Sequence, residues 1–391
     1  MSHADDMMIS IRGDIPKSIP YAPRFDIWFN AHQYRGTLPE IYADCSDPLD
    51  VSRRIGVAGH MVVPDYVRPE EPEDMYDRGI GIYHLTQVPY RAVMKGIDRT
   101  VSEHDGTTDV CYRTPKGTVT VSYSFTEDMR RSGSTISWVN RHAIQSPDDY
   151  EPLSYIFDHL DVEPSYSGLE SMIRKTGGDA LIVANGSMPA SPMQYIMRDL
   201  MGMTEFFMAM ADEPVRLGKL ADAIGGYFER LMPVAAACPA EVILLGANTD
   251  ATITYPPFYE EHILPWLSRF TGMAHDRGKY VAIHADGENK GLFELYRQSG
   301  IDILEAVAPS PMTTNSIREI LSLSEGMTVW GGIPSVILMP DWQEDDFRAY
   351  MEDVLDAVRG RSRFILGVSD TTPPDAVFER LLTIRDMCRN A

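Results

Sequence analysis

The sequence predicts an α/β protein built as a (β/α)8 barrel of the TIM type, and the alternation of segments in its second half is the basis for this prediction. Short apolar runs end in Gly, Asn, Asp or Pro, and a segment with helical periodicity follows each of them. The runs are apolar throughout, as in parallel strands that are covered on both faces. Six such units in an unbroken series favour a closed barrel over an open doubly wound sheet.

The strands and helices of these units can be assigned by residue range. The predicted strands are residues 179–184, 241–245, 280–283, 302–307, 327–330 and 363–368. The predicted helices fall within residues 192–237, 255–277, 290–299, 314–324 and 344–359, and a last helix closes the chain. The apolar run at residues 25–29 is the candidate for the first strand of the barrel.

The first half of the chain has a different pattern. Two alternating runs, residues 109–113 and 118–124, flank the turn sequence Thr-Pro-Lys-Gly, which is typical of a β-hairpin. We expect residues 83–134 to form an insertion or a side layer beside the barrel. No low-complexity linker interrupts the sequence, so residues 1–391 are predicted to form a single domain with an elaborated N-terminal part.

The composition excludes several classes of protein. The 391 residues include 35 Lys and Arg against 57 Asp and Glu, and the net charge of −22 disfavours binding to nucleic acid. No run approaches the roughly 18 apolar residues of a membrane span. Residues 1–14 lack the apolar core of a signal peptide. The four cysteines lie far apart without a CxxC pair, so we expect a cytoplasmic protein with reduced thiols.

Polar side chains follow the predicted strands where each strand ends. In a barrel of this type the reacting groups lie at the C-terminal ends of the strands. Carboxylates gathered there repel one another unless a cation lies among them or one of them stays protonated. The residues in these positions are Asn185, Asn248, Asp250, His284, Asp286, Glu305 and Asp370.

The pair His284-x-Asp286 is the basis for a metal-site prediction. Alternate residues of an extended segment point to the same side, so both side chains can bind one metal ion, with a third ligand from another strand. An isolated HxD pair is common, and Glu305 could instead pair with a buried arginine. We interpret the other histidines, among them His32 and His60, as structural or surface groups. The sequence contains no GxGxxG, P-loop or GxSxG motif.

Several segments carry a resemblance to a known family. The closest segments are HADGENKGLFEL at 284–295, GIDILEA at 300–306, VWGGIP at 329–334 and FILGVSDTTPP at 364–374, with weaker similarity at 28–35 and 248–265. In these segments the sequence resembles the uroporphyrinogen decarboxylase superfamily, which includes barrel methyltransferases that serve methylated corrinoids. The similarity covers residues 179–389, just over half of the chain. It implies the barrel fold independently of the strand pattern.

Departures from the family pattern favour its methyltransferase branch. The decarboxylases bind a tetrapyrrole with eight carboxylates through an arginine pair, whereas the matching stretch here has only Arg35, with Arg24 just before it. The methyltransferases bind zinc through His-x-Cys and a later cysteine. The resemblance places His284, Asp286 and Asp370 at these positions, so both thiolates are replaced by carboxylates. Such a set favours zinc or another divalent metal that polarises an oxygen substrate.

The predicted function is methyl transfer from an O-methylated small molecule to a reduced corrinoid, carried on a partner protein. Glu305 is predicted to be the general acid that protonates the leaving oxygen, which needs a raised pKa. The side chains predicted to bind or surround the substrate, with Asp250 as a second catalytic group, are Trp28, His32, Asn185, Asn248, Asp250, Tyr255 and Trp330. The resemblance also suggests a homodimer.

Three alternatives remain open at this stage. The first is a metal-independent decarboxylase, in which Asp250 or Glu305 protonates a carbanion and Arg24 or Arg35 binds the carboxylate. The second is a non-catalytic binding protein on a barrel scaffold. The third concerns the methyl acceptor, since tetrahydrofolate or a thiol could replace the corrinoid.

Overall fold

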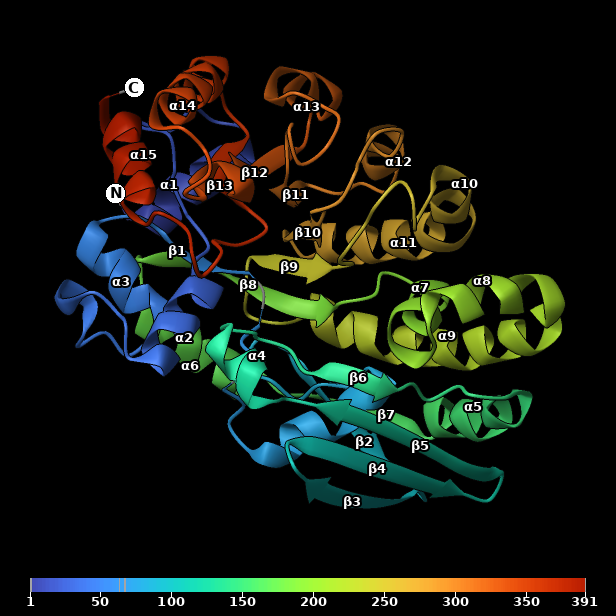
Figure 1. Ribbon diagram of the computed structural model, residues 1–391. Coiled ribbons are helices and arrows are strands. Elements are labelled where there is room, and N and C mark those ends of the chain that lie inside the picture. The colour runs from blue at the N-terminus through green and yellow to red at the C-terminus, as the bar shows by residue number, and fades with distance from the viewer. Residues whose placement is uncertain (1, 63, 67, 391) are drawn as a thin grey trace.

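A curled sheet of seven parallel strands forms the centre of the computed structural model, which describes residues 2–62, 64–66 and 68–390 (Figure 1). The strand order is β1-β8-β9-β10-β11-β12-β13, so each strand after β1 lies next to its predecessor in the series. The bounds are β1 (Gly59–Met61), β8 (Ala180–Ser187), β9 (Val242–Leu245), β10 (Tyr280–His284), β11 (Ile303–Val307), β12 (Thr328–Pro334) and β13 (Phe364–Ser369). The six strands predicted in the second half of the sequence are confirmed.

The segment at residues 20–22 connects the two edges of this sheet. The Ala22 N–H donates to the Leu366 carbonyl in β13 at 2.9 Å, and Tyr21 pairs with Leu366 in a parallel bridge. On the other side, the Ala58 N–H donates to the Tyr21 carbonyl at 3.0 Å, immediately before β1. In the described chain a one-residue bridge therefore occupies the place where an eighth strand was expected.

The prediction of a strand at residues 25–29 is wrong, because these residues begin helix α2 (Asp26–Arg35). Asp26 lies in the first turn of this helix, where a negative charge is favourable, and Arg35 lies in the last turn. Gly36 ends the helix in the left-handed conformation, with φ of 66°. The helix places its apolar side chains in the core, whereas residues 20–22 form the extended segment.

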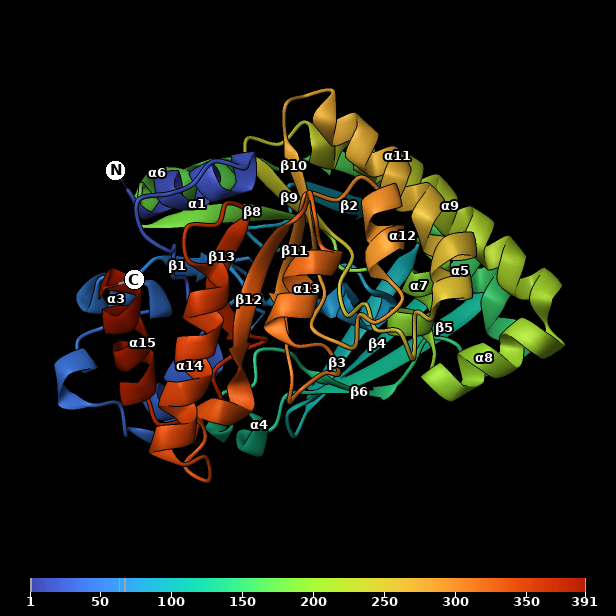
Figure 2. The ribbon, with the colours of Figure 1, turned by 90° about the horizontal axis from the view of Figure 1, so that it is seen from above.

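Helices cover the outer side of the curled sheet, and α11 to α14 lie there in both views (Figures 1 and 2). The long helix α9 has buried apolar residues along its length. The helical segments after residue 190 are α7 (Pro192–Tyr195), η4 (Ile196–Leu200), α8 (Met203–Asp212), α9 (Pro214–Ala236), α10 (Pro256–Phe258), η5 (Tyr259–Ile263), α11 (Leu264–His275), α12 (Phe293–Gln298), α13 (Ile317–Leu323), η6 (Ser335–Leu338), α14 (Glu344–Val358) and α15 (Glu379–Asn390).

The N-terminal part adds a layer beside the curled sheet (Figure 1). The predicted hairpin is present, since β4 (Thr107–Thr114) pairs antiparallel with β5 (Gly117–Ser124). β3 (Asp98–His104) and β6 (Trp138–Arg141) complete a four-stranded sheet, and β2 (Tyr90–Met94) pairs with β7 (Leu160–Pro164). The helices of this part are α1 (His3–Arg12), η1 (Glu40–Tyr42), α3 (Pro48–Ile55), η2 (Pro72–Ile80), α4 (Glu127–Arg131), η3 (Pro147–Asp149), α5 (Tyr150–Asp158) and α6 (Ser167–Thr176).

The curled sheet has an apolar core on each face, because strand side chains alternate between the two faces. One core contains Val183, Leu244, Ile303 and Ile365 and fills the inside of the curl, while a larger one packs under the helices. Among the described residues, no helix is both long and apolar enough to cross a membrane.

Candidate functional site

Two strand ends bring His284 and Glu305 together. The parallel pairing of β10 with β11 sets His284 beside Glu305 and Ala282 beside Ile303. Ala282 and Ile303 belong to the core inside the curl, so the residues two positions later point into the same space. Polar side chains therefore lie next to an apolar layer, at the C-terminal ends of the strands. We call this end of the curled sheet the strand-end face.

Glu305 is almost completely buried and interacts with two histidines. Its exposure is 1%, and its two oxygens meet different rings: Oε2 lies 2.5 Å from His284 Nδ1, and Oε1 lies 2.9 Å from His60 Nε2. Burial alone would raise the pKa of this carboxyl, but the positive charge and hydrogen bond of His284, with the hydrogen bond of His60, lower it to about 2. These contacts thus favour the ionised form of Glu305, whereas its predicted role as the general acid depends on a raised pKa.

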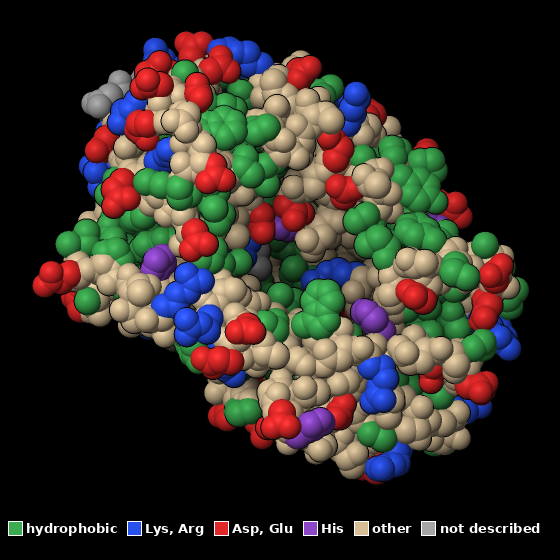
Figure 3. All heavy atoms as spheres, in the orientation of Figure 1, with side chains coloured by type: hydrophobic (Ala, Val, Ile, Leu, Met, Phe, Trp, Pro, Cys, Tyr) green, Lys and Arg blue, Asp and Glu red, His purple; other side chains and the backbone are tan. Residues whose placement is uncertain are grey.

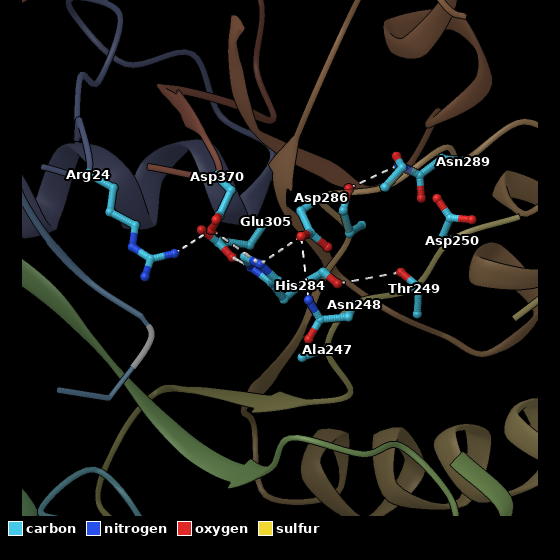
Figure 4. A network of polar contacts seen from close by, with 12 residues as sticks. Arg24, Ala247, Asn248, Thr249, Asp250, His284, Asp286, Asn289, Glu305 and Asp370 are labelled. Carbon is cyan, nitrogen blue, oxygen red and sulfur yellow. Dashed lines mark hydrogen bonds and ion pairs between the residues drawn. The ribbon is translucent and has the colours of Figure 1, made fainter. Parts of the chain in front are cut away.

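His284 turns its other ring nitrogen towards two carboxylates (Figure 4). Nε2 lies 3.6 Å from Asp286 Oδ2 and 3.4 Å from Asp370 Oδ1. Burial of the ring opposes protonation, but the charges of Glu305 and Asp286 outweigh it and raise the pKa of His284 well above 6.5. His284 is therefore an imidazolium whose Nε2–H lies between acidic side chains that are themselves partly exposed.

Arg24 completes the group from the segment that precedes α2. Its guanidinium donates to Asp370 Oδ1 and, at 3.1 Å, to Asp26 Oδ1, which also accepts from the Thr371 hydroxyl at 2.9 Å. Burial disfavours the charge on Arg24, but Asp26 and Asp370 raise its pKa above its ordinary value. Burial would also raise the pKa of Asp370, but Arg24 and His284 lower it. We call this set of interacting residues the charged network: Arg24, Asp26, His60, His284, Asp286, Glu305 and Asp370.

The charged network carries an excess of negative charge. Its four carboxylates outnumber the guanidinium of Arg24 and the rings of His60 and His284. The space-filling view shows a hollow near the centre of the molecule, bordered by acidic, basic and histidine side chains (Figure 3). An excess of acid at a partly open site disfavours polyanionic ligands and favours neutral or cationic groups.

The predicted metal ligands are close together but already interact with each other and with Arg24. A histidine nitrogen and carboxylate oxygens are donors that zinc accepts. However, the Asp370 oxygen nearest to His284 Nε2 is the one that accepts from Arg24. Within the described part of the chain, no group of three or more His, Cys, Asp or Glu side chains is placed to hold a metal ion. In this arrangement His284, Asp286 and Asp370 form ion pairs, and their role as metal ligands stays a prediction.

Asp250 supports a loop instead of facing His284. Its Oδ2 accepts from the Glu288 N–H at 2.8 Å, and its Oδ1 accepts from the Thr252 N–H at 2.6 Å. Figure 4 shows its carboxylate to one side of the charged network. Burial would raise the pKa of Asp250, but these backbone hydrogen bonds lower it. The catalytic role predicted for Asp250 is not supported, because both of its oxygens are used to join two loops.

Two residues predicted to surround the substrate belong to the packing around α2. Trp28 is 2% exposed and stacks on Phe378 with ring centroids 4.1 Å apart. His32 accepts from or donates to the Thr37 hydroxyl at 2.8 Å, and its Nε2 lies 2.9 Å from the Pro374 carbonyl. α2 directs both side chains into contact with the C-terminal segment, and their place in the substrate site stays a prediction.

The remaining predicted substrate residues are divided between the network and the core. Asn248 reaches the network, with Nδ2 at 3.5 Å from Asp286 Oδ2. Asn185 is buried and contacts the Met188 sulfur, and Tyr255 packs against Phe258. Trp330 is 1% exposed, with its ring centroid 5.3 Å from that of His60. Of these four, Asn248 and Trp330 contact residues of the charged network.

His60 is the functional candidate that the sequence interpretation missed. It lies on the three-residue strand β1, which is too short to be recognised from periodicity, and no neighbouring polar motif distinguishes it. Its importance depends on the pairing of β1 with β8, which brings it to the inside of the curl. Arg24 was recognised only as a carboxylate binder, and Asp26, its partner, was not recognised at all.

Comparisons with known proteins find similarity in structure but not in sequence. No protein-family model matches the sequence, and no curated protein matches it. The structure is similar to a methyltransferase from Methanosarcina mazei, with a TM-score of 0.54 and 12% identity over 100% of this chain and 99% of that chain. A B12-independent methionine synthase from Shewanella sp. W3-18-1 matches with a TM-score of 0.43 and 12% identity over 95% and 97%. The chain therefore shares its whole fold with the Methanosarcina methyltransferase.

Proposed function

We propose that this protein is a methyltransferase that removes a methyl group from the oxygen of a small molecule at the strand-end face. The single observation that carries the proposal is the placement of His284. Its Nδ1 is hydrogen-bonded to Glu305, and its Nε2 points towards the acidic side chains of a partly open site, which favour the protonated ring. The end-to-end fold similarity to a methyltransferase supports the same reaction class.

The proposed step needs an acid at the leaving oxygen. The methyl carbon bonds to the acceptor nucleophile, the carbon–oxygen bond breaks, and its electron pair stays on the oxygen. That oxygen takes the Nε2 proton of His284, which becomes neutral. A leaving phenol has a pKa of about 10, so protonation during bond breaking lowers the barrier, and such acid catalysis contributes about 10²–10⁴-fold.

The network residues have distinct roles in this proposal. Glu305 accepts the Nδ1–H of His284, which fixes the ring and stabilises the imidazolium. Glu305 is thus a positioning residue, and the acid role predicted for it passes to His284. Asp370 and Asp286 favour the proton on Nε2, while Arg24 holds Asp370 in place.

The methyl acceptor is proposed from the sequence resemblance. It implies a reduced corrinoid on a partner protein, with tetrahydrofolate and a thiol as the alternatives. The proposed step requires a nucleophile. His284, Asp286 and Asp370 are ion-paired with Arg24 or with each other, and no step is assigned to a metal ion.

A decarboxylase is less well supported by the arrangement of arginines. Arg24 is already bonded to Asp26 and Asp370, so it has no free charge for a substrate carboxylate. Arg35 donates to the Arg131 carbonyl and lies 3.6 Å from Asp375; within the described part of the chain it has no hydrogen bond or ion pair with the charged network. Neither arginine of the alternative reaction is available.

The test is turnover of a panel of methyl ethers in the presence of cob(I)alamin, tetrahydrofolate or coenzyme M, with release of the demethylated product as the readout. We expect at least one ether to be demethylated by the wild-type chain. The His284→Gln variant should lose about 10²–10⁴-fold in kcat. His104→Gln is the matched control, because His104 is exposed in the side sheet and its ion-pair partner is Asp109.

Two results would contradict the proposal. The first is carbon dioxide release from a small acid without any demethylation across the panel. The second is equal loss of activity in the His284→Gln and His104→Gln variants, which would mean that the site is elsewhere.

A further inference from the structure

A separate cavity of about 470 Å³ lies beside the charged network. Its walls come from the start of α3, the chain after β1, residues 85–87 and one face of α6. The α6 residues Gly168, Met172 and Lys175 recur at the spacing of one helix face, so this face is directed into the cavity. A volume of this size is typical of pockets that enclose small organic ligands.

The inner end of this side cavity is formed by the back of the charged network. Arg24, Asp26 and His60 line it, whereas His284 and Glu305 are not among the described lining residues. His60 contacts the Glu305 carboxylate that holds His284, and Arg24 contacts the Asp370 carboxylate near His284 Nε2. A ligand here would touch the network without reaching the proton that the proposed reaction uses.

Two hydrogen-bonding atoms are available at the inner end. His60 Nε2 lies 2.9 Å from Glu305 Oε1, so Nδ1 is the ring nitrogen left to bond to a ligand. Gln87 donates from Nε2 to the Met61 and Val183 carbonyls at 3.0 and 3.2 Å, which fixes its Oε1 as an acceptor. Neither His60 Nδ1 nor Gln87 Oε1 has a hydrogen bond among the described residues. Together they fit a ligand that presents an O–H or N–H.

The lining holds as many carboxylates as cations, and one of its cations has no ion-pair partner among the described residues. Arg24, Arg53 and Arg68 each have a carboxylate partner, whereas Lys175 has none within ion-pair distance among the described residues. Of the lining acids, Glu70 accepts from the Thr86 hydroxyl at 2.7 Å. Lys175 therefore favours a single negative charge on the ligand, at the α6 side of the cavity.

Apolar side chains form part of the wall between these groups. Phe25, Leu49, Met61, Leu85 and Met172 supply its hydrophobic surface. Apolar walls with a few placed polar groups are typical of sites for small organic molecules.

We propose that the side cavity is a second small-molecule site, which binds an organic monoanion with an apolar, ring-sized body, a hydroxyl or amide donor at one end and a carboxylate at the other. The inner donor is bound by His60 and Gln87, and the carboxylate by Lys175. This inference does not depend on the methyl-transfer proposal, because it concerns binding at a place that His284 does not line.

The experiment is calorimetric titration of the full chain with 4-hydroxyphenylacetate, which has all three features. We expect a Kd of about 1 mM or tighter. Phenylacetate, without the donor, and 2-(4-hydroxyphenyl)ethanol, without the charge, should each bind about tenfold more weakly, because each leaves one polar group of the cavity unpaired.

Variants on α6 locate the site. Lys175→Ala should weaken 4-hydroxyphenylacetate about tenfold without changing the affinity for the neutral alcohol. Met172→Trp should abolish binding by filling the cavity, with folding checked by circular dichroism. Arg174→Ala is the matched control, since Arg174 is the adjacent cation on α6, pairs with Glu170 and does not line the cavity.

The proposal is overturned if 4-hydroxyphenylacetate does not bind, or if it binds equally to wild type, Lys175→Ala and Met172→Trp. It is also overturned if the affinities of the three probes are the same. Demethylation of methyl ethers could fail while this binding pattern holds, or the reverse, so the two proposals fail separately.

Discussion

Glu305 is ionised at a position that is only 1% exposed, because two histidines share its two oxygens. Removing one partner of such a buried pair leaves an uncompensated charge and costs about 3–5 kcal/mol. The contact with Glu305 also raises the pKa of His284. The chemistry of the strand-end face therefore depends on a residue that the substrate does not have to touch.

The Glu305→Gln variant tests this positioning role. Without the carboxylate charge, the pKa of His284 should fall and kcat should decrease by about 10–100-fold, with a larger loss as the pH rises. The measurements are the pH profile of kcat and the titration of the ¹⁵N-labelled His284 ring. Glu294→Gln, an exposed acid paired with Arg297, is the control. An unchanged His284 titration in Glu305→Gln would contradict the assignment.

The pH dependence of stability should also depend on Glu305. Its pKa is about 2 in the folded chain and about 4.5 in the unfolded chain, so its stabilisation is present above pH 4.5 and is lost as the pH falls towards 2. The free energy of unfolding of the wild type relative to Glu305→Gln should decrease by about 2 kcal/mol between pH 6 and pH 3. Urea denaturation at both pH values measures this. A constant difference between the two proteins would show that the carboxyl is not ionised by its partners.

Trp330 packs on His60, and its indole N–H is buried without a hydrogen-bond partner among the described residues. An unpaired buried donor costs about 1–3 kcal/mol, so removing it offsets part of the lost packing. Trp330→Phe should change the free energy of unfolding by no more than about 1 kcal/mol, whereas Trp330→Ala should lose about 3–5 kcal/mol. Urea denaturation compares the two variants. A large loss in Trp330→Phe would mean that the N–H does have a partner.

At the scale of elements, the loops after β9 and β10 are joined by one side chain. Asp250 accepts backbone N–H groups from Thr252 and Glu288, and a Cβ at Gly287 would lie 2.5 Å from its Oδ2. This close approach requires glycine at position 287. The two loops therefore act as one unit that carries Asn248 and Asp286 at the strand-end face.

Asp250→Ala should destabilise the loops and leave the acid chemistry intact. We expect a loss of about 1–3 kcal/mol in the free energy of unfolding, since two backbone donors lose their acceptor. KM should rise while kcat changes less than threefold. Thermal denaturation and steady-state kinetics on the active ether measure both quantities. A fall of more than 100-fold in kcat at unchanged stability would restore the catalytic role predicted from the sequence.

Helices and strands can be predicted from the sequence where the signal lies within their own residues and the turn that follows. The strands after residue 179 are recognised because each is a short buried run with a clear turn signal after it. Residues 25–29 have the same apolar character but form the start of α2, and Gly36 at its end is the signal that could have identified a helix. A strand of three residues such as β1 gives no periodicity to recognise.

At the scale of the whole molecule, the candidate site could be predicted only in part. His284, Asp286, Glu305 and Asp370 follow strands that the sequence identifies, so their meeting at one face could be predicted. The lowered pKa values of Glu305 and Asp370 could not, because His60 and Arg24, which contribute to them, come from the far N-terminal part of the chain. The contacts of Trp28 and His32 could not be predicted for the same reason, since the helix that carries them packs against the C-terminal segment.

The curled sheet therefore gathers residues from both ends of the chain into one charged network. In the proposed reaction, His284 of this network protonates the leaving oxygen. If so, the loss of rate in His284→Gln must depend on how much the leaving oxygen needs a proton. Phenols with electron-withdrawing substituents leave as stable anions, whereas aliphatic alcohols do not.

The most direct measurement is kcat/KM for a series of methyl ethers with leaving groups of increasing pKa, in wild type and in His284→Gln. The loss caused by the substitution should be small for acidic phenols and should grow by at least about tenfold towards the least acidic leaving group. A loss that is the same for every ether would contradict the role of His284 as the acid.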